Sequence, residues 1–261
     1  MSRQSLSKFN PGSVNELVSI AFPLVLSSLS THLMLFVDRL LLARYDVLTM
    51  TAVVTVSFVC SVFQFTGITF TATAEVFVGQ FNGAKQYNKL ATPVWQMIFF
   101  SALSCLIYWP VAVWGPTYLM TPEIHSLGAS YFRWIMSFAF ITPFIGALSA
   151  FFIGRGRGIV VTVSSFIGNG INALLAYLLI FGKGPFPEMG AEGASIATVT
   201  ASCLQALILF SIFLNKKNNQ LYKTRQLKLD KNIFRQCLKI ASPSALTRFI
   251  EFTGWAFLCL I

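Results

Sequence analysis

Residues 47–74 read VLTMTAVVTVSFVCSVFQFTGITFTATA and contain no Asp, Glu, Lys or Arg. A helix rises 1.5 Å per residue, so about 20 apolar residues cross the hydrocarbon core of a bilayer, and this stretch is longer. Of the 261 residues, 55% are hydrophobic and 11% are charged, whereas soluble domains carry about 25% charged residues. The composition therefore predicts a membrane protein and excludes an ordinary soluble enzyme.

Five further stretches lack charged side chains and are long enough to span a bilayer. They are residues 17–37, 90–122, 134–154, 158–182 and 193–215. These runs lack the strict alternation of outer-membrane barrel strands, so they are predicted to be helices. The sequence thus predicts an all-α polytopic fold, with a six-helix transmembrane lobe (1–215), a basic cytoplasmic linker (216–239) and an incomplete seventh transmembrane helix (240–261).

The distribution of Lys and Arg predicts the orientation of these helices. Of the 19 basic residues, 14 fall in the segments on the N-terminal side of the membrane and 3 in the segments on the other side. Basic residues accumulate in cytoplasmic loops, so the N-terminus is predicted to be cytoplasmic, in a plasma membrane such as the bacterial inner membrane. The net charge of +10 then faces an anionic lipid leaflet, and no nucleic-acid partner is expected.

A short repeat suggests a second half. The sequence SIAFP at residues 19–23 recurs as KIASP at residues 239–243. With six crossings between them, both segments would start helices that run from inside to outside, as in transporters built from two parallel halves. We therefore expect a longer protein with two lobes, acting as a monomer once both are present. The five cysteines show no spacing typical of a disulfide or metal site, and no resident cofactor is expected.

Ionisable residues within spans are costly, which makes them functional candidates. Glu251 lies about 16 Å along the helix from Ile240, near the predicted midplane. It could bind a coupling ion such as Na⁺, or substrate, or form a structural ion pair with Arg248, one turn earlier. Asp38, late in the first span, could have the same binding role or pair with Arg39 at the interface; the sequence alone leaves both readings open.

Three polar residues and one proline complete the candidate set. Glu75 is either a gate contact or an acid at a helix end. Asn169 and Asn172 lie one turn apart and could line a cavity or join helices by hydrogen bonds. Pro143 removes a backbone donor from the span 134–154, so a kink is expected there.

Several of these segments resemble the multidrug and toxic compound extrusion (MATE) transporters. They are AFPLVLSSLS (21–30) with Val37-Asp38-Arg39, VGQFNGA (78–84), NALLAYLLIFG (172–182), MGAEGASIAT (189–198) and Pro243 to Glu251. The resemblance implies two six-helix lobes around a cleft that opens alternately to either side. It further implies export of small amphiphilic, often cationic, organic compounds in exchange for Na⁺ or H⁺, with Asp38, Asn172 and Glu251 at positions that matter to the family. One departure is Ala176, where a proton-coupled branch carries Asp.

The sequence leaves other functions to consider. A flippase for a lipid-linked sugar shares the architecture, but would need several cationic side chains among its helices, where only Arg133 and Arg248 occur. A non-transporting membrane subunit is a further alternative. An intramembrane enzyme is not expected, because no HExxH or Gly-x-Ser-x-Gly motif is present.

Overall fold

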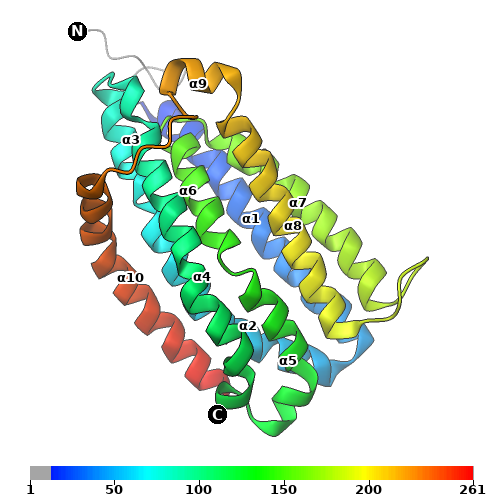
Figure 1. Ribbon diagram of the computed structural model, residues 1–261. Coiled ribbons are helices and arrows are strands. Elements are labelled where there is room, and N and C mark those ends of the chain that lie inside the picture. Colours follow the sequence, from blue (N-terminus) through cyan, green and yellow to red (C-terminus); the bar gives the residue numbers. More distant parts are fainter. Residues whose placement is uncertain (1–12, 261) are drawn as a thin grey trace.

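The computed structural model describes residues 13–260, and all the regular elements among them are helices. The elements are α1 (Val14–Tyr45), α2 (Val47–Ala72), α3 (Ala74–Gly83), η1 (Tyr87–Lys89), α4 (Ala91–Leu119), α5 (Pro122–Ser137), α6 (Ile141–Ile153), α7 (Gly158–Ile180), α8 (Gly190–Phe213), α9 (Lys216–Tyr222) and α10 (Lys231–Leu260). The long helices lie side by side in one elongated bundle (Figure 1). The predicted all-α fold class is confirmed.

The number of membrane crossings also agrees with the sequence. Five segments are long and apolar enough to cross a bilayer, namely Leu17–Tyr45, Val47–Gly83, Tyr87–Leu119, Gly158–Ile180 and Gly190–Phe213. Together α5 and α6 meet the same test as one span bent by 42°. The start of α1 and the helix α9 lie at the same end of the bundle (Figure 1), as six crossings require.

The bend between α5 and α6 lies at residues 138–140, just before Pro143. Because proline has no N–H, the carbonyl of Ala139 loses its usual helical donor and instead accepts from Thr142 N at 3.2 Å. The hydroxyl of Ser101 on α4 donates to the carbonyl of Phe140 at 2.8 Å. The predicted kink is confirmed, and Ser101 supplies a bond to the backbone at the break.

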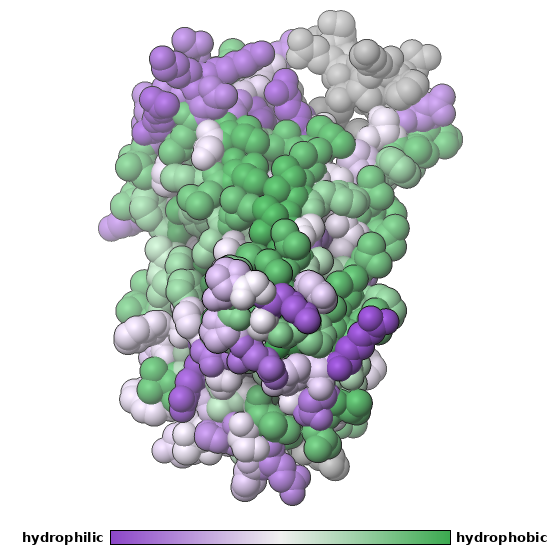
Figure 2. All heavy atoms as spheres, turned by 90° about the vertical axis from the view of Figure 1, so that its right-hand side faces the viewer, coloured by the Kyte–Doolittle hydropathy of each residue, from purple (hydrophilic) through white to green (hydrophobic). Residues whose placement is uncertain are grey.

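One face of the bundle is largely hydrophobic, as expected of a protein that contacts lipid. On the side where α7 lies, Figure 2 shows mainly hydrophobic residues across the middle and hydrophilic residues towards both ends. Large apolar side chains on these helices are exposed, among them Leu174 at 60% and Leu207 at 62%. Such exposure over a broad surface is unusual for soluble proteins but normal for a surface solvated by acyl chains.

Close packing inside the bundle depends on small residues. Gly193 of α8 lies against α7, where a Cβ at residue 193 would come within 2.8 Å of the backbone carbon of Leu179. Ala176, Ala194 and Ala197 are buried in the same contact, all at 2% exposure or less. Small residues at such interfaces allow two membrane helices to approach closely.

The segment predicted to be a basic linker, residues 216–239, contains helical structure. Residues 216–222 form α9, and α10 begins at Lys231 instead of near Ile240. Asp230 explains the early start, because its Oδ1 accepts hydrogen bonds from the backbone N–H groups of Asn232 at 2.9 Å and Ile233 at 3.1 Å. From there α10 runs along α2, with which it makes its most extensive contacts.

Candidate functional site

Asp38 lies on α1 where this helix packs against α7. Its side chain is half-buried and lies beside that of Asn172 on α7. Asn172 is fully buried, with 0% of its surface exposed. The structure therefore brings together two residues that are 134 positions apart in the chain (172 − 38), both of them candidates from the sequence.

Each of the two side chains has one oxygen atom without a hydrogen-bond partner. Oδ1 of Asp38 and Oδ1 of Asn172 are both shielded from solvent, and neither accepts a hydrogen bond within the described residues 13–260. The amide Nδ2 of Asn172 donates to Thr198 Oγ1 on α8 at 3.1 Å. Buried oxygens without a donor are costly, so this arrangement, the Asp38 site (Asp38, Asn172 and Thr198), is suited to accept a proton or a small cation.

A small cavity lies next to Thr198. Its volume is about 20 Å³, enough for about one water molecule. The lining residues come from α2, α5, α6, α8 and the break between α5 and α6, and are Gln64, Ile135, Phe138, Ile141, Thr142, Thr198, Val199 and Ser202. Because Thr198 both lines the cavity and accepts from Asn172, the cavity adjoins the Asp38 site and is one hydrogen bond away from Asn172.

Polar contacts continue along α1 and α7 away from the Asp38 site. Asn169 Nδ2 donates to Ser30 Oγ at 2.8 Å. Ser27 Oγ donates to Ser165 Oγ at 3.2 Å, and Gln205 Nε2 of α8 donates to the same hydroxyl at 2.9 Å. Asn169 and Asn172 thus bond to different helices, and in this structure both make the interhelical bonds that were one of the two predicted readings.

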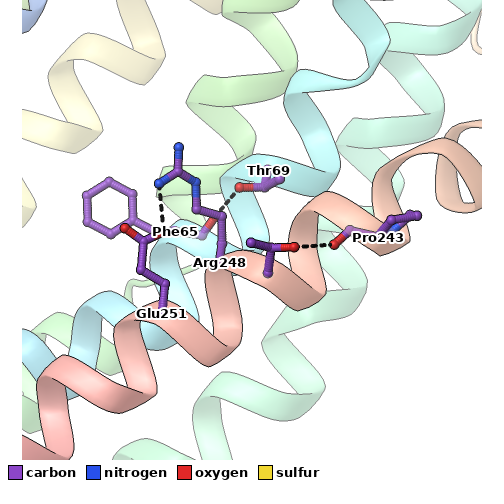
Figure 3. A network of polar contacts seen from close by, with 6 residues as sticks. Phe65, Thr69, Pro243, Arg248 and Glu251 are labelled. Atoms are coloured by element: carbon purple, nitrogen blue, oxygen red, sulfur yellow. Dashed lines mark hydrogen bonds and ion pairs between the residues drawn. The ribbon is translucent and has the colours of Figure 1, made fainter.

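Glu251 and Arg248 form an ion pair on α10. Arg248 Nη1 and Glu251 Oε2 are 2.9 Å apart, and the two side chains are 53% and 44% exposed. Figure 3 shows the pair beside Phe65 of α2, whose ring stacks on that of Phe252 with centroids 4.5 Å apart. Because α10 packs on α2 and α4, Glu251 is not part of the Asp38 site between α1, α7 and α8.

The remaining candidates lie elsewhere. Glu75 is half-buried in the first turn of α3. Helix α3 lies towards the end of the bundle that carries α9 (Figure 1). A carboxylate in the first turn of a helix interacts favourably with the helix dipole. Ala176 is fully buried among apolar residues of α2 and α8, so the Asp38 site contains a single carboxylate.

The family model MatE matches residues 23–178, which is more than half of the chain. The chain belongs to the MatE family. Among curated MatE-like relatives, a probable multidrug resistance protein NorM from Thermotoga maritima is 25% identical over 244 residues. That alignment covers 92% of this chain and 52% of the relative. A protein of the same description from Neisseria meningitidis is 23% identical, with 95% and 56% covered.

Solved structures of MATE transporters share this fold. The crystal structure of the eukaryotic MATE transporter AtDTX14 superposes with a TM-score of 0.79 at 22% identity, covering 93% of this chain and 54% of that one. An inward-facing multidrug resistance MATE family transporter gives a TM-score of 0.74 at 17% identity, with 93% and 56% covered. The chain thus spans about half the length of the relatives and structures that it matches.

Two partners in this region of the MatE fold were missed from sequence. Thr198 and Ser30 each belong to a segment that resembles the family, but the sequence predicts no individual role for either residue. Both are hydroxyl residues within apolar helices, where hydroxyls commonly bond to their own helix. Their bonds to Asn172 and Asn169 follow from how α1, α7 and α8 pack, which the sequence does not display.

Proposed function

We propose that the chain is the N-terminal part of a cation-coupled antiporter that exports amphiphilic, mainly cationic, organic compounds by alternating access. The observation that carries the proposal is the pair of unsatisfied oxygens on Asp38 and Asn172. A proton or Na⁺ bound by Asp38 would satisfy its unpaired oxygen, and its release would leave a half-buried carboxylate that favours an organic cation or a new proton.

Membership of the MatE family and the printed descriptions of the relatives support transport of drug-like compounds. The distribution of basic residues supports a cytoplasmic N-terminus in a plasma membrane. The electrostatics of the described helices support cationic cargo, because Arg133 is exposed and Arg248 is paired with Glu251. In this proposal the complete protein acts as a monomer and has no resident cofactor. The coupling ion is H⁺ or Na⁺.

The test is efflux of a fluorescent organic cation from membrane vesicles that contain the full protein, under a proton gradient and separately under a sodium gradient. Asp38→Asn keeps the shape of the side chain but cannot release a proton or bind a cation by charge. We expect gradient-driven efflux to fall at least about tenfold, because transition between the two ion states is lost. Arg39→Gln, at the exposed neighbouring position, is the matched control and should retain efflux. Full efflux by Asp38→Asn with unchanged ion dependence would refute the proposal.

A further inference from the structure

Residues 214–230, here called the strap, connect α8 to α10 and lie across one end of the bundle (Figure 1). Although the strap is rich in Lys and polar residues, parts of it are deeply buried. Thr224 is 0% exposed and Asn218 is 8% exposed. A solvated linker would not bury such residues, so the strap is a docked part of the structure.

Two side chains of α4 bind the backbone of the strap. Trp95 Nε1 donates to the carbonyl of Thr224 at 2.9 Å, and Gln96 Nε2 donates to the carbonyl of Lys228 at 2.6 Å. Trp95 is 7% exposed and Gln96 is fully buried. Because both acceptors are backbone carbonyls, these bonds fix the path of the strap regardless of its side chains.

The third anchor is Arg155, in the turn between α6 and α7. Its guanidinium carbon lies 3.8 Å from the ring centroid of Phe151 on α6 and 4.4 Å from that of Tyr222 at the end of α9. Arg155 Nε also donates to the carbonyl of Phe151 at 3.1 Å. The cation is therefore held by the bundle on one side and contacts the strap through an aromatic ring on the other.

Arg155 is unusual because it is a buried cation without a counter-ion. It is 7% exposed, its Nη1 has no hydrogen-bond partner, and no carboxylate lies within ion-pair distance in the part of the chain that the structure describes. Desolvation lowers the pKa of Arg155, yet a guanidinium stays protonated at neutral pH. With no counter-ion, this charge is stabilised by the two aromatic rings, by the carbonyl of Phe151 and by the side chain of Tyr222, so the cation depends in part on the strap.

We propose that Arg155 is the positioning residue that docks the strap onto the bundle and, through the strap, holds the first turns of α10 in place. The inference does not depend on the proposed transport function. The strap leads into α10 at Asp230. The first turns of α10 include Cys237, which is 0% exposed and belongs to the same hydrophobic cluster as several residues of α4. If the strap lifts, the backbone that leads into these turns loses its anchor.

The experiment measures labelling of thiols by a membrane-impermeant maleimide in inverted vesicles that contain the full protein. One reporter is Thr224→Cys on the strap, and the second is the native Cys237 on α10. Peptide mass spectrometry distinguishes the two. Burial raises the pKa of the Cys237 thiol to about 12, so this thiol reacts slowly until its surroundings open.

In the Thr224→Cys background, Arg155→Met removes the cation and keeps most of the side-chain length. We expect the labelling rate to rise about tenfold or more at both reporter positions, because the cation–π contact is lost. Arg155→Lys keeps the charge but not the planar group, and an intermediate rate is expected. The matched control is Arg157→Met, which removes an exposed cation from the same turn and should label as slowly as the parent.

An unchanged rate at position 224 in a folded Arg155→Met variant would overturn the docking role, and so would an equal rise in Arg157→Met. A rise at position 224 with no change at Cys237 would overturn the claim that the strap holds α10. Should Arg155→Met fail to fold, Tyr222→Ala tests the same contact from the strap, with the same expected and contrary outcomes. Tyr222→Phe keeps the ring but removes the hydroxyl that also interacts with Arg155, so an intermediate rate is expected.

Discussion

The hydrogen bond from Asn172 Nδ2 to Thr198 Oγ1, 3.1 Å long, joins α7 to α8 and at the same time fixes the direction of the other half of the amide. Oδ1 of Asn172 has no hydrogen-bond partner among residues 13–260. A hydroxyl on α8 thereby helps to fix the side chain that lies beside Asp38 of α1. Hydrogen bonds that orient the residues of an ion site in this way tune its affinity.

Thr198→Val removes this acceptor and nearly preserves the volume of the side chain. We expect gradient-driven efflux by the full protein to fall about tenfold, which corresponds to the loss of one buried hydrogen bond. Thr198→Ser retains the hydroxyl and should keep most of the activity. If valine were tolerated at position 198 with no loss of efflux, the orientation of Asn172 would not matter to the reaction.

Glu251 has two candidate roles, which are binding of an ion or substrate and a structural ion pair with Arg248, and its substitution distinguishes them. Both side chains are about half exposed, and exposed pairs contribute less than about 1 kcal/mol to stability. Glu251→Gln should therefore change the free energy of unfolding little, while efflux falls at least about tenfold if the carboxylate binds ion or substrate. Thermal unfolding and vesicle efflux measured on the same preparation check this. Retained efflux would contradict the binding role of Glu251, and so would a loss of efflux that only follows a loss of folded protein. Either result would mean that the ion pair is structural.

Gly193 is expected to be intolerant of even one methyl group. A Cβ there would lie 2.8 Å from backbone atoms of Leu179. The backbone of a packed helix can move away only at a cost in free energy. Gly193→Ala should destabilise the protein by about 1–3 kcal/mol through overpacking. Gly170→Ala, on α7 with open space around the new Cβ, is the control and should be neutral or slightly stabilising, by up to about 1 kcal/mol. Thermal unfolding in detergent gives both values, and equal effects would argue against close packing at Gly193.

Asp46 should give the protein a pH-dependent contribution to stability. This residue caps α2, where its Oδ2 accepts from Thr49 N at 2.7 Å and from Thr49 Oγ1 at 2.6 Å, and these bonds lower its pKa. A lowered pKa in the folded state means that the contribution is present above the ordinary value of about 3.9 and is lost as the pH falls through the lower, folded-state value.

The wild type should therefore melt at a higher temperature than Asp46→Ala above about pH 5, and the difference should shrink below about pH 4. Asp46→Asn caps a helix without titrating and should keep its advantage over alanine at both pH values. A wild-type advantage that grows on acidification would contradict the assigned direction of the pKa shift.

The crossings were predictable because lipid imposes a simple rule on the chain. A backbone in hydrocarbon must satisfy its own hydrogen bonds, so uncharged runs such as 47–74 become helices whatever their neighbours do. The kink at Pro143 was predictable for a similarly local reason, the missing N–H. The location of the break at residues 138–140 was not, because it also involves Ser101 on another helix.

The candidate site was predictable in its members but not in its assembly. Asp38 and Asn172 stand out as polar residues in apolar spans, yet their proximity is a property of how α1 packs on α7. The strap is the clearest failure of local reasoning. Its Lys-rich sequence is typical of a solvated linker, while the bond from Trp95 to the carbonyl of Thr224 joins residues 129 positions apart. Every residue has a backbone carbonyl, so the sequence of a segment does not show which of its carbonyls accept hydrogen bonds from side chains elsewhere.

The anchors of the strap have a consequence for how the protein is made. Trp95, Gln96 and Arg155 all precede residues 214–230 in the chain, so their docking surface has been synthesised before the strap leaves the ribosome. Helix α10 follows and carries Arg248 and Glu251. We therefore expect the nascent bundle to act as a template, so that the order of translation delivers α10 to α2.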